Sequence, residues 1–181
     1  MDKYQKLVFN FIYVMAIRDS VMQRAYVGER KWMWDNSEDM QDVKSCLEEH
    51  LNMILTGKYS DKEDYDSDFC ELTKKICNLI NEKKQESDFK FGNAQKLINM
   101  MDKYFYITIF NDSAKRECFK YCHCPMDRQM IKKVLKKEFS WGTLEFDNDG
   151  KIPKQYIEFL DEVRNLAGQD YYPVEYDYKY W

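Results

Sequence analysis

Apolar side chains recur every three or four residues along most of this chain, the spacing that places them on one face of an α-helix. A clear case is residues 153–167, where Tyr156, Leu160 and Val163 share one side. Six glycines and three prolines among 181 residues leave little room for the tight turns of an all-β fold. The pattern predicts six helices, over about residues 2–27, 36–57, 67–85, 91–109, 126–139 and 153–167.

Two segments lack the helical period. Residues 58–68 are acidic and carry no apolar repeat, so we expect a mobile loop there. In the tail, residues 170–181, apolar Val174, Tyr176, Tyr178 and Tyr180 alternate with charged residues, which is the period of a strand or an extended docking arm. Residues 143–146 are the nearest candidate partner strand.

These elements predict a mainly α fold formed by one domain over residues 1–181. We expect a compact bundle of about six helices, completed by a short β-hairpin or an extended aromatic C-terminal tail. At this length and with 44% hydrophobic residues, the chain can bury a core without help from a metal or disulfides.

The composition and the charge pattern indicate where the protein is located and which kind of partner it binds. No apolar run is long enough to span a membrane, and the N-terminal helix is interrupted by Asn10, Arg18 and Asp19, unlike a signal peptide. We therefore expect a cytoplasmic protein whose six cysteines are reduced thiols. Acidic residues dominate 28–90 and 141–181, whereas basic residues dominate 91–140. This blocked pattern suits a protein partner better than general nucleic-acid binding. The alternative is that the oppositely charged segments neutralise each other within the fold.

The stretch from Phe119 to Asp127 concentrates scarce, reactive residue types. His123 and Asp127, four residues apart, could form an acid–base pair, with Lys96 stabilising an anionic transition state. A metal-independent nucleic-acid-processing enzyme could be assembled in this way. The structural alternative is that Asp127 caps a helix and His123 bonds to the backbone. We favour the structural alternative, because one histidine and one aspartate without a nucleophile form a weak catalytic set.

The same stretch offers thiolate and imidazole ligands for zinc. Its four candidates are Cys118, Cys122, His123 and Cys124. They lack a second, well-spaced pair of ligands, because Cys70 and Cys77 are separated by six residues. Buried core cysteines are the alternative, so we expect neither a metal nor any other cofactor.

A third candidate lies on the helix predicted at 91–109. Gln95 and Asn99 fall one turn apart, with Asp102 next on the same face and Lys96 beside them. The cluster Gln95, Lys96 and Asn99 indicates either a buried polar network, a ligand contact or a solvated stripe.

Three sequence pieces together resemble a dispersed group of small proteins from gut anaerobes and their mobile elements. They are the run from Phe91 to Asn99 (FGNAQKLIN), the run from His123 to Asp127 (HCPMD), and the C-terminal Pro173-x-Glu-Tyr ending in Trp181. The resemblance covers about the C-terminal half, and the mobile-element setting implies an anti-CRISPR or other anti-defence protein.

The leading functional hypothesis is therefore a non-enzymatic inhibitor that binds an RNA-guided nuclease or its nucleic-acid complex. Acidic and tyrosine-rich segments would meet the basic channel of such a nuclease, and the basic helix would contact RNA or DNA phosphates. Fourteen tyrosines also permit a homodimer. The candidate partner-binding residues are Asp61, Glu63, Asp64, Asp66, Asp68, Glu175, Tyr176, Asp177, Tyr178, Lys132, Lys133 and Lys136.

Overall fold

The computed structural model describes residues 3–21, 40–83 and 88–180, and every regular element within these ranges is helical. The prediction of a mainly α fold is confirmed. In chain order the elements are α1 (Lys3–Val21), α2 (Gln41–Leu55), α3 (Lys62–Lys83), α4 (Phe91–Thr108), α5 (Ser113–Glu117), α6 (Arg128–Val134), η3 (Trp141–Thr143), α7 (Lys154–Ala167), α8 (Pro173–Tyr176) and η4 (Asp177–Tyr180).

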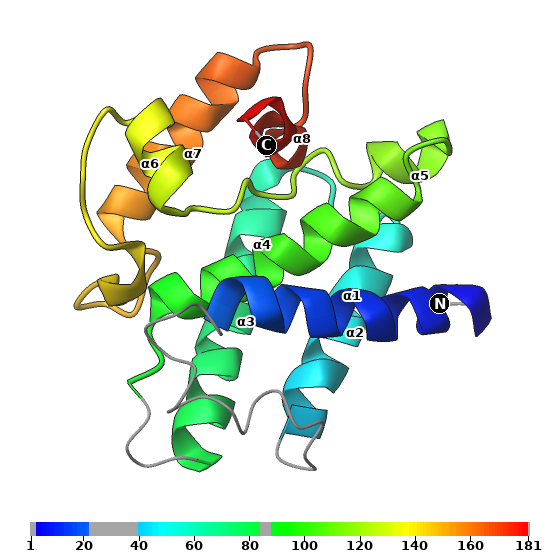
Figure 1. Ribbon diagram of the computed structural model, residues 1–181, viewed down its shortest axis with the longest axis horizontal. Coiled ribbons are helices and arrows are strands. Elements are labelled where there is room, and N and C mark those ends of the chain that lie inside the picture. The colour runs from blue at the N-terminus through cyan, green and yellow to red at the C-terminus, as the bar shows by residue number, and fades with distance from the viewer. Residues whose placement is uncertain (1–2, 22–39, 84–87, 181) are drawn as a thin grey trace.

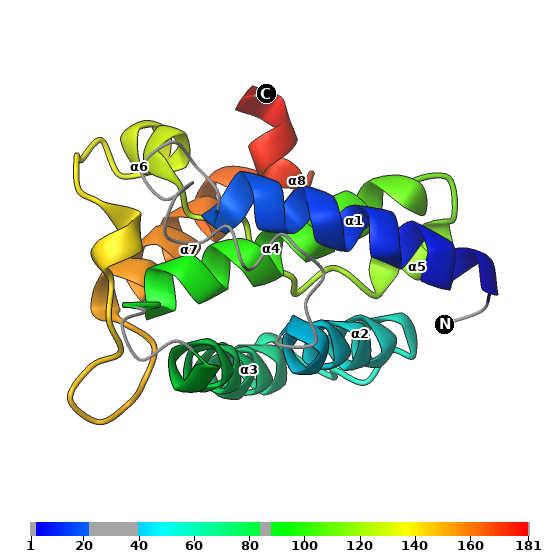
Figure 2. The same ribbon diagram turned by 60° about the horizontal axis from the view of Figure 1, so that its bottom comes forward.

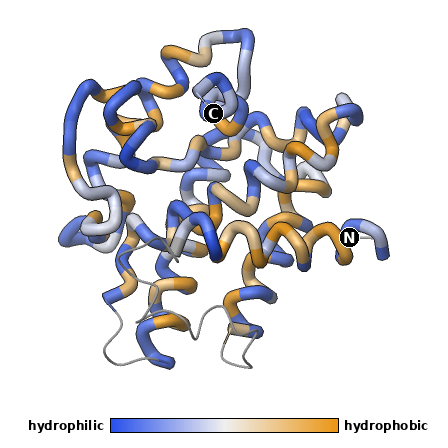
Figure 3. Tube along the Cα trace, in the orientation of Figure 1, coloured by the Kyte–Doolittle hydropathy of each residue, from blue (hydrophilic) through white to orange (hydrophobic). Residues whose placement is uncertain are grey.

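Helix α4 is the centre of the arrangement, in contact with α1, α2, α3, η3 and α8. Figures 1 and 2 show α1 running along α4, while α2 and α3 form a layer that crosses the pair. Helix α7 packs against α6 and α8. Figure 3 shows that apolar residues extend along much of α1, which buries Phe9, Ile12 and Ala16 in the core.

The first turn of α4 lies unusually close to another segment. A Cβ atom at Gly92 would stand 1.7 Å from the carbonyl oxygen of Trp141, so only glycine allows this approach. The Gly92 N–H donates to the carbonyl oxygen of Leu144 at 3.1 Å. This contact fixes η3 and the residues after it on the start of the central helix.

The acidic segment differs from the expected mobile loop. Helix α3 begins at Lys62, and the carboxylate of Asp61 accepts from the Asp64 N–H at 2.9 Å, as a helix cap does. Glu63 and Asp64 lie in the first turn, where negative charge is favourable to the helix dipole. Acidic residues at a helix start obscure the apolar period, so residues 62–68 are helical and the connection is shorter than predicted.

The predicted extended tail and hairpin are also wrong for the described residues. Pro173 occupies the first turn of α8, and the Glu175 carboxylate accepts from the Tyr172 N–H at 2.8 Å. Val174 and Tyr176 are buried, and residues 141–143 form η3 instead of a partner strand. The alternating pattern is produced by a short α-helix followed by a 3₁₀ turn.

The count of six helices is not confirmed, because the described residues include the short helix α5, which was not predicted. The remaining differences concern helix ends. The basic helix ends at Val134, five residues earlier than predicted, and Lys136 adopts a positive φ of 54° just beyond it. The predicted continuation of the first helix to residue 27 and the predicted helix start at 36 lie outside the described residues. None of the described helices combines the length and apolar character that crossing a membrane requires.

Candidate functional site

The polar face of α4 lies inside the molecule. All of its polar side chains there are buried, namely Asn93, Gln95, Lys96, Asn99, Asp102 and Lys103. A buried polar group destabilises a fold unless it finds a partner to replace water. The contacts made by these side chains therefore indicate what the face holds in place.

Gln95 and Asn99 bind the backbone and each other. The Gln95 amide nitrogen donates to the carbonyl oxygens of Gly92 at 3.0 Å and Met126 at 2.9 Å, and its oxygen accepts from the Met126 N–H at 3.2 Å. Asn99 Nδ2 donates to Gln95 Oε1 at 3.0 Å and to the Tyr156 hydroxyl at 2.8 Å. The two amides thereby fix the segment before α6, and also α7, against α4.

His123 extends the same chain of hydrogen bonds. Its imidazole is fully buried, with Nδ1 3.2 Å from the Tyr156 hydroxyl and Nε2 2.7 Å from Asp66 Oδ1. A carboxylate only accepts, so Nε2 carries the proton and Nδ1 accepts from the tyrosine. Both ring nitrogens are thus engaged, and neither faces a space where a substrate could approach.

The carboxylate beside His123 is Asp66, not Asp127. Arg164 Nη2 also donates to Asp66, at 2.9 and 3.3 Å to its two oxygens. Burial lowers the pKa of His123 below its ordinary value of 6.5, against the opposing influence of Asp66. Burial alone would raise the pKa of Asp66, but its hydrogen bonds with His123 and Arg164 lower it on balance. At neutral pH the site holds a neutral imidazole and an ionised, compensated carboxylate.

Asp127 caps α6, as the structural alternative proposed. Its Oδ1 accepts from two backbone N–H groups of the first turn, at 2.9 and 3.0 Å. Lys96 Nζ lies 3.9 Å from Asp127 Oδ2 and 4.6 Å from the centre of the Trp141 ring. Burial lowers the pKa of the Lys96 ammonium, although Asp127 opposes this. The structure therefore brings Lys96 and Asp127 together but engages His123 with other partners.

A second buried histidine completes the polar core. His50 Nε2 lies 3.1 Å from Asp102 Oδ2, which also accepts from the Tyr65 hydroxyl at 2.9 Å. Sequence reasoning placed Asp102 on the correct face of α4 but did not assign it this partner, 52 residues away in the chain. The available signal for His50 was its place on the apolar face of the helix predicted at 36–57, beside Leu47, Leu51 and Ile54.

The cysteines of the candidate zinc site do not assemble one. Cys122 and Cys124 are buried, and burial raises the pKa of both thiols far above the ordinary value. Cys118 points its sulfur toward the Ala114 carbonyl oxygen at 3.5 Å. Among the described residues there is no group of three or more His, Cys, Asp or Glu side chains arranged for a metal ion.

Several predicted partner-binding residues serve the interior instead. Asp177 forms a buried ion pair with Lys103, and Tyr176 is buried beside it. The Tyr178 hydroxyl donates to the Lys103 carbonyl oxygen at 2.5 Å, and the half-buried Glu175 bonds to Tyr106. These four residues of the tail, and Asp66 of the acidic segment, are held by internal contacts. Their contact with a partner stays a prediction.

The other predicted partner-binding residues lie nearer the surface. Asp61, Glu63 and Asp64 are exposed, while Asp68 is half-buried and pairs with Lys58 at 2.5 Å. The basic residues are partly used as well: Lys132 pairs with Glu138, Lys133 stacks on Tyr180, and Lys136 bonds to the Lys133 carbonyl oxygen. Their contact with a partner stays a prediction.

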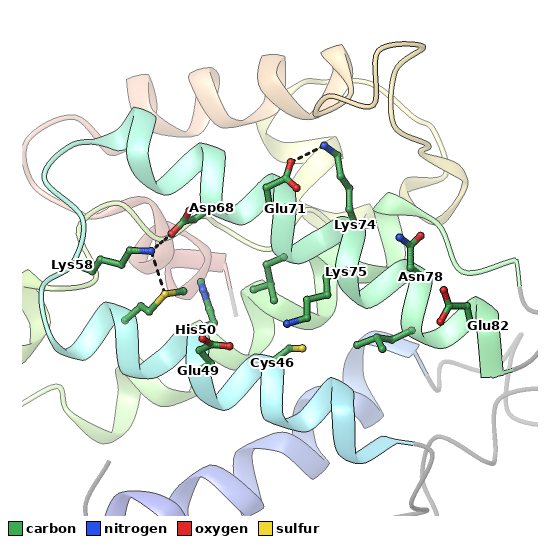
Figure 4. A pocket seen from close by; sticks show the side chains of 13 residues that line it. Cys46, Glu49, His50, Lys58, Asp68, Glu71, Lys74, Lys75, Asn78 and Glu82 are labelled. Carbon is green, nitrogen blue, oxygen red and sulfur yellow. Dashed lines mark hydrogen bonds and ion pairs between the residues drawn. The ribbon is translucent and has the colours of Figure 1, made fainter.

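The cleft between α2 and α3 has a volume of about 570 Å³ (Figure 4). His50 lies at its base, and the Lys58–Asp68 ion pair crosses one end, beside Met53. Acidic and basic side chains alternate along the walls, so the cleft has no dominant charge. Its lining does not include His123, Asp127 or Lys96.

Comparison of the chain with protein-family models, with curated proteins and with solved structures finds no match. The geometry is therefore the basis for assigning a role to the polar face. Its donors and acceptors tie the surrounding segments to α4 through several sets of contacts, and they leave no open position for a substrate at His123.

Proposed function

We propose that this protein acts by binding another protein and not by catalysis. The supporting observation is that the imidazole of His123, the most plausible catalytic group in the sequence, is fully buried with both nitrogens hydrogen-bonded. A general acid or base must reach the proton that it transfers, directly or through one water. Lys96, the second member of the proposed catalytic set, is buried against Trp141.

The exposed side chains are a second observation that supports a binding function. Asp61, Glu63 and Asp64 project from the start of α3. Large apolar side chains are exposed elsewhere, including Phe11 on α1 and Tyr171 after α7. Acidic groups steer the approach of a basic partner, and exposed aromatic groups supply contact area.

The target that fits this charge pattern is an RNA-guided nuclease, whose nucleic-acid channel is strongly basic. The resemblance of the C-terminal half to small proteins of mobile elements supports the same choice. We therefore propose an anti-CRISPR inhibitor whose acidic α3 start competes with nucleic acid for the channel. The basic residues of α6 would contact the phosphates of a bound guide or target strand.

A binding and cleavage assay with purified RNA-guided nucleases tests this function. We expect co-elution at moderate salt and loss of target cleavage, both weakened by Glu63→Lys because the charge facing the channel is reversed. Asp149→Lys reverses an equally exposed carboxylate in the 147–150 turn and serves as the matched control, with no expected effect.

Two results would contradict the proposal. The nuclease target is wrong if the wild-type protein neither binds nor inhibits any nuclease of this class. The binding function itself is wrong if the wild-type protein degrades RNA or DNA and His123→Asn abolishes that turnover while the variant stays folded.

A further inference from the structure

Helix α1 exposes a continuous apolar stripe on the side away from the core. Tyr4, Leu7, Phe11 and Val14 keep 74%, 64%, 67% and 38% of their surface in water. Soluble helices normally turn polar residues toward solvent, and a helix that is apolar all round is normally buried on every side. Helix α1 is buried on only one side, so its second apolar face has no partner among the described elements.

The spacing of the stripe is that of a helix-pairing seam. Its members are separated by three, four and three residues, the a and d positions of a heptad repeat. The opposite face of α1 supplies the core contacts through Phe9, Ile12 and Ala16. The exposed stripe is therefore not needed to attach α1 to α4, and a second helix could lie along it.

The exposed charged residues of α1 all carry positive charge. They are Lys3, Lys6 and Arg18, and Arg18 continues the seam four residues beyond Val14. The half-buried Asp19 accepts a hydrogen bond from Tyr104. Lys6 makes a loose contact with Glu48 at 3.8 Å and keeps most of its surface in water. A ligand for this face must bring apolar side chains at helical spacing together with negative charge along its edges.

We propose that α1 is a docking surface for an amphipathic helix of a partner protein, with acidic residues flanking its apolar side. The inference rests on the proposed binding function and names a surface that is separate from the acidic start of α3. The docked helix would cover the four apolar side chains and place its carboxylates near Lys3, Lys6 and Arg18.

Other occupants fit the charges less well. If two copies of α1 paired in parallel, each lysine would face the same lysine of the other copy. If they paired antiparallel, Arg18 of one copy would face the lysines of the other. Both arrangements place like charges together. A membrane-surface helix needs its polar face free in water, but here the reverse face of α1 is buried against α4. The chain also has a net charge of −4, which is unfavourable at an anionic lipid surface.

The test uses two synthetic amphipathic peptides of about 20 residues, long enough to form a helix. Both carry leucine at the a and d positions; one has glutamate and the other lysine at the flanking positions. We expect the wild-type protein to bind the glutamate peptide and Phe11→Glu to bind it about tenfold or more weakly. Ile157→Glu, which changes a comparably exposed apolar residue on α7, should bind like the wild type.

Reversal of the charges of Lys3 and Lys6 distinguishes specific docking from nonspecific adhesion. The Lys3→Glu, Lys6→Glu double variant should lose affinity for the glutamate peptide and gain affinity for the lysine peptide. Equal binding by all variants, or no binding by the wild type, overturns the proposal. So does self-association that Phe11→Glu abolishes, or Phe11-dependent binding to vesicles containing phosphatidylglycerol. If Glu63→Lys loses nuclease inhibition but still binds the glutamate peptide, that result bears on the proposed nuclease inhibition and not on docking at α1.

Discussion

Replacement of Gly92 by alanine is expected to destabilise the protein by about 3 kcal/mol or more, enough to unfold many domains. The new Cβ would lie 1.7 Å from the Trp141 carbonyl oxygen and 2.8 Å from its carbonyl carbon. Both are backbone atoms that cannot rotate away, so either η3 or the start of α4 must move. Urea unfolding followed by circular dichroism measures the loss.

Gly57→Ala is the control for this substitution. Gly57 has a positive φ of 66° but no atom within 4 Å of an added Cβ, so the cost there is backbone strain alone, about 1 kcal/mol. A Gly92→Ala protein as stable as Gly57→Ala would show that η3 does not lie against the first turn of α4.

Replacement of Lys103 by methionine is the second change with a large expected effect, about 3–5 kcal/mol of destabilisation. Lys103 and Asp177 form a buried ion pair between α4 and η4, with side chains 2% and 4% exposed. Removing the ammonium takes the Lys103 charge away from a buried carboxylate, in surroundings that solvate it poorly. Thermal and urea unfolding of the single variant measure the effect.

The double variant Lys103→Met, Asp177→Leu separates pairing from packing. Removal of both charges should recover much of the stability lost in the single variant, because no charge then stays buried alone. Lys137→Met breaks the exposed pair with Glu158 and should change stability little. A Lys103→Met protein as stable as Lys137→Met would mean that η4 does not pack on α4 in solution.

Helical periodicity was sufficient to predict α4 and α7, and the C-terminal end of α2, to within a few residues, because each has apolar residues on a core-facing side. The periodicity failed to predict segments in which helix-capping residues interrupt the apolar repeat. Acidic residues that cap and stabilise the start of α3 resemble a solvated loop in sequence. In the tail, Pro173 and Glu175 start a short helix whose alternating tyrosines resemble a strand.

The residues of the candidate site could be predicted from the sequence, but their hydrogen-bond partners could not. The sequence singled out Gln95, Asn99 and His123, and all three belong to one buried network. It paired His123 with Asp127 because they are neighbours in the chain, whereas the structure supplies Asp66 from 57 residues away. Contacts over such distances depend on how helices pack, which single-sequence patterns do not encode.

His123 is the critical residue for a structural role of the reactive side chains. Substitution of either histidine assigns the two imidazole resonances, so an NMR titration of His123 gives its pKa directly. We predict a pKa below 6.5, since burial disfavours the charged ring, and no change when inorganic phosphate or an oligonucleotide is added. A pKa of 6.5 or above that shifts on addition of phosphate would place the imidazole in an accessible site and contradict the account.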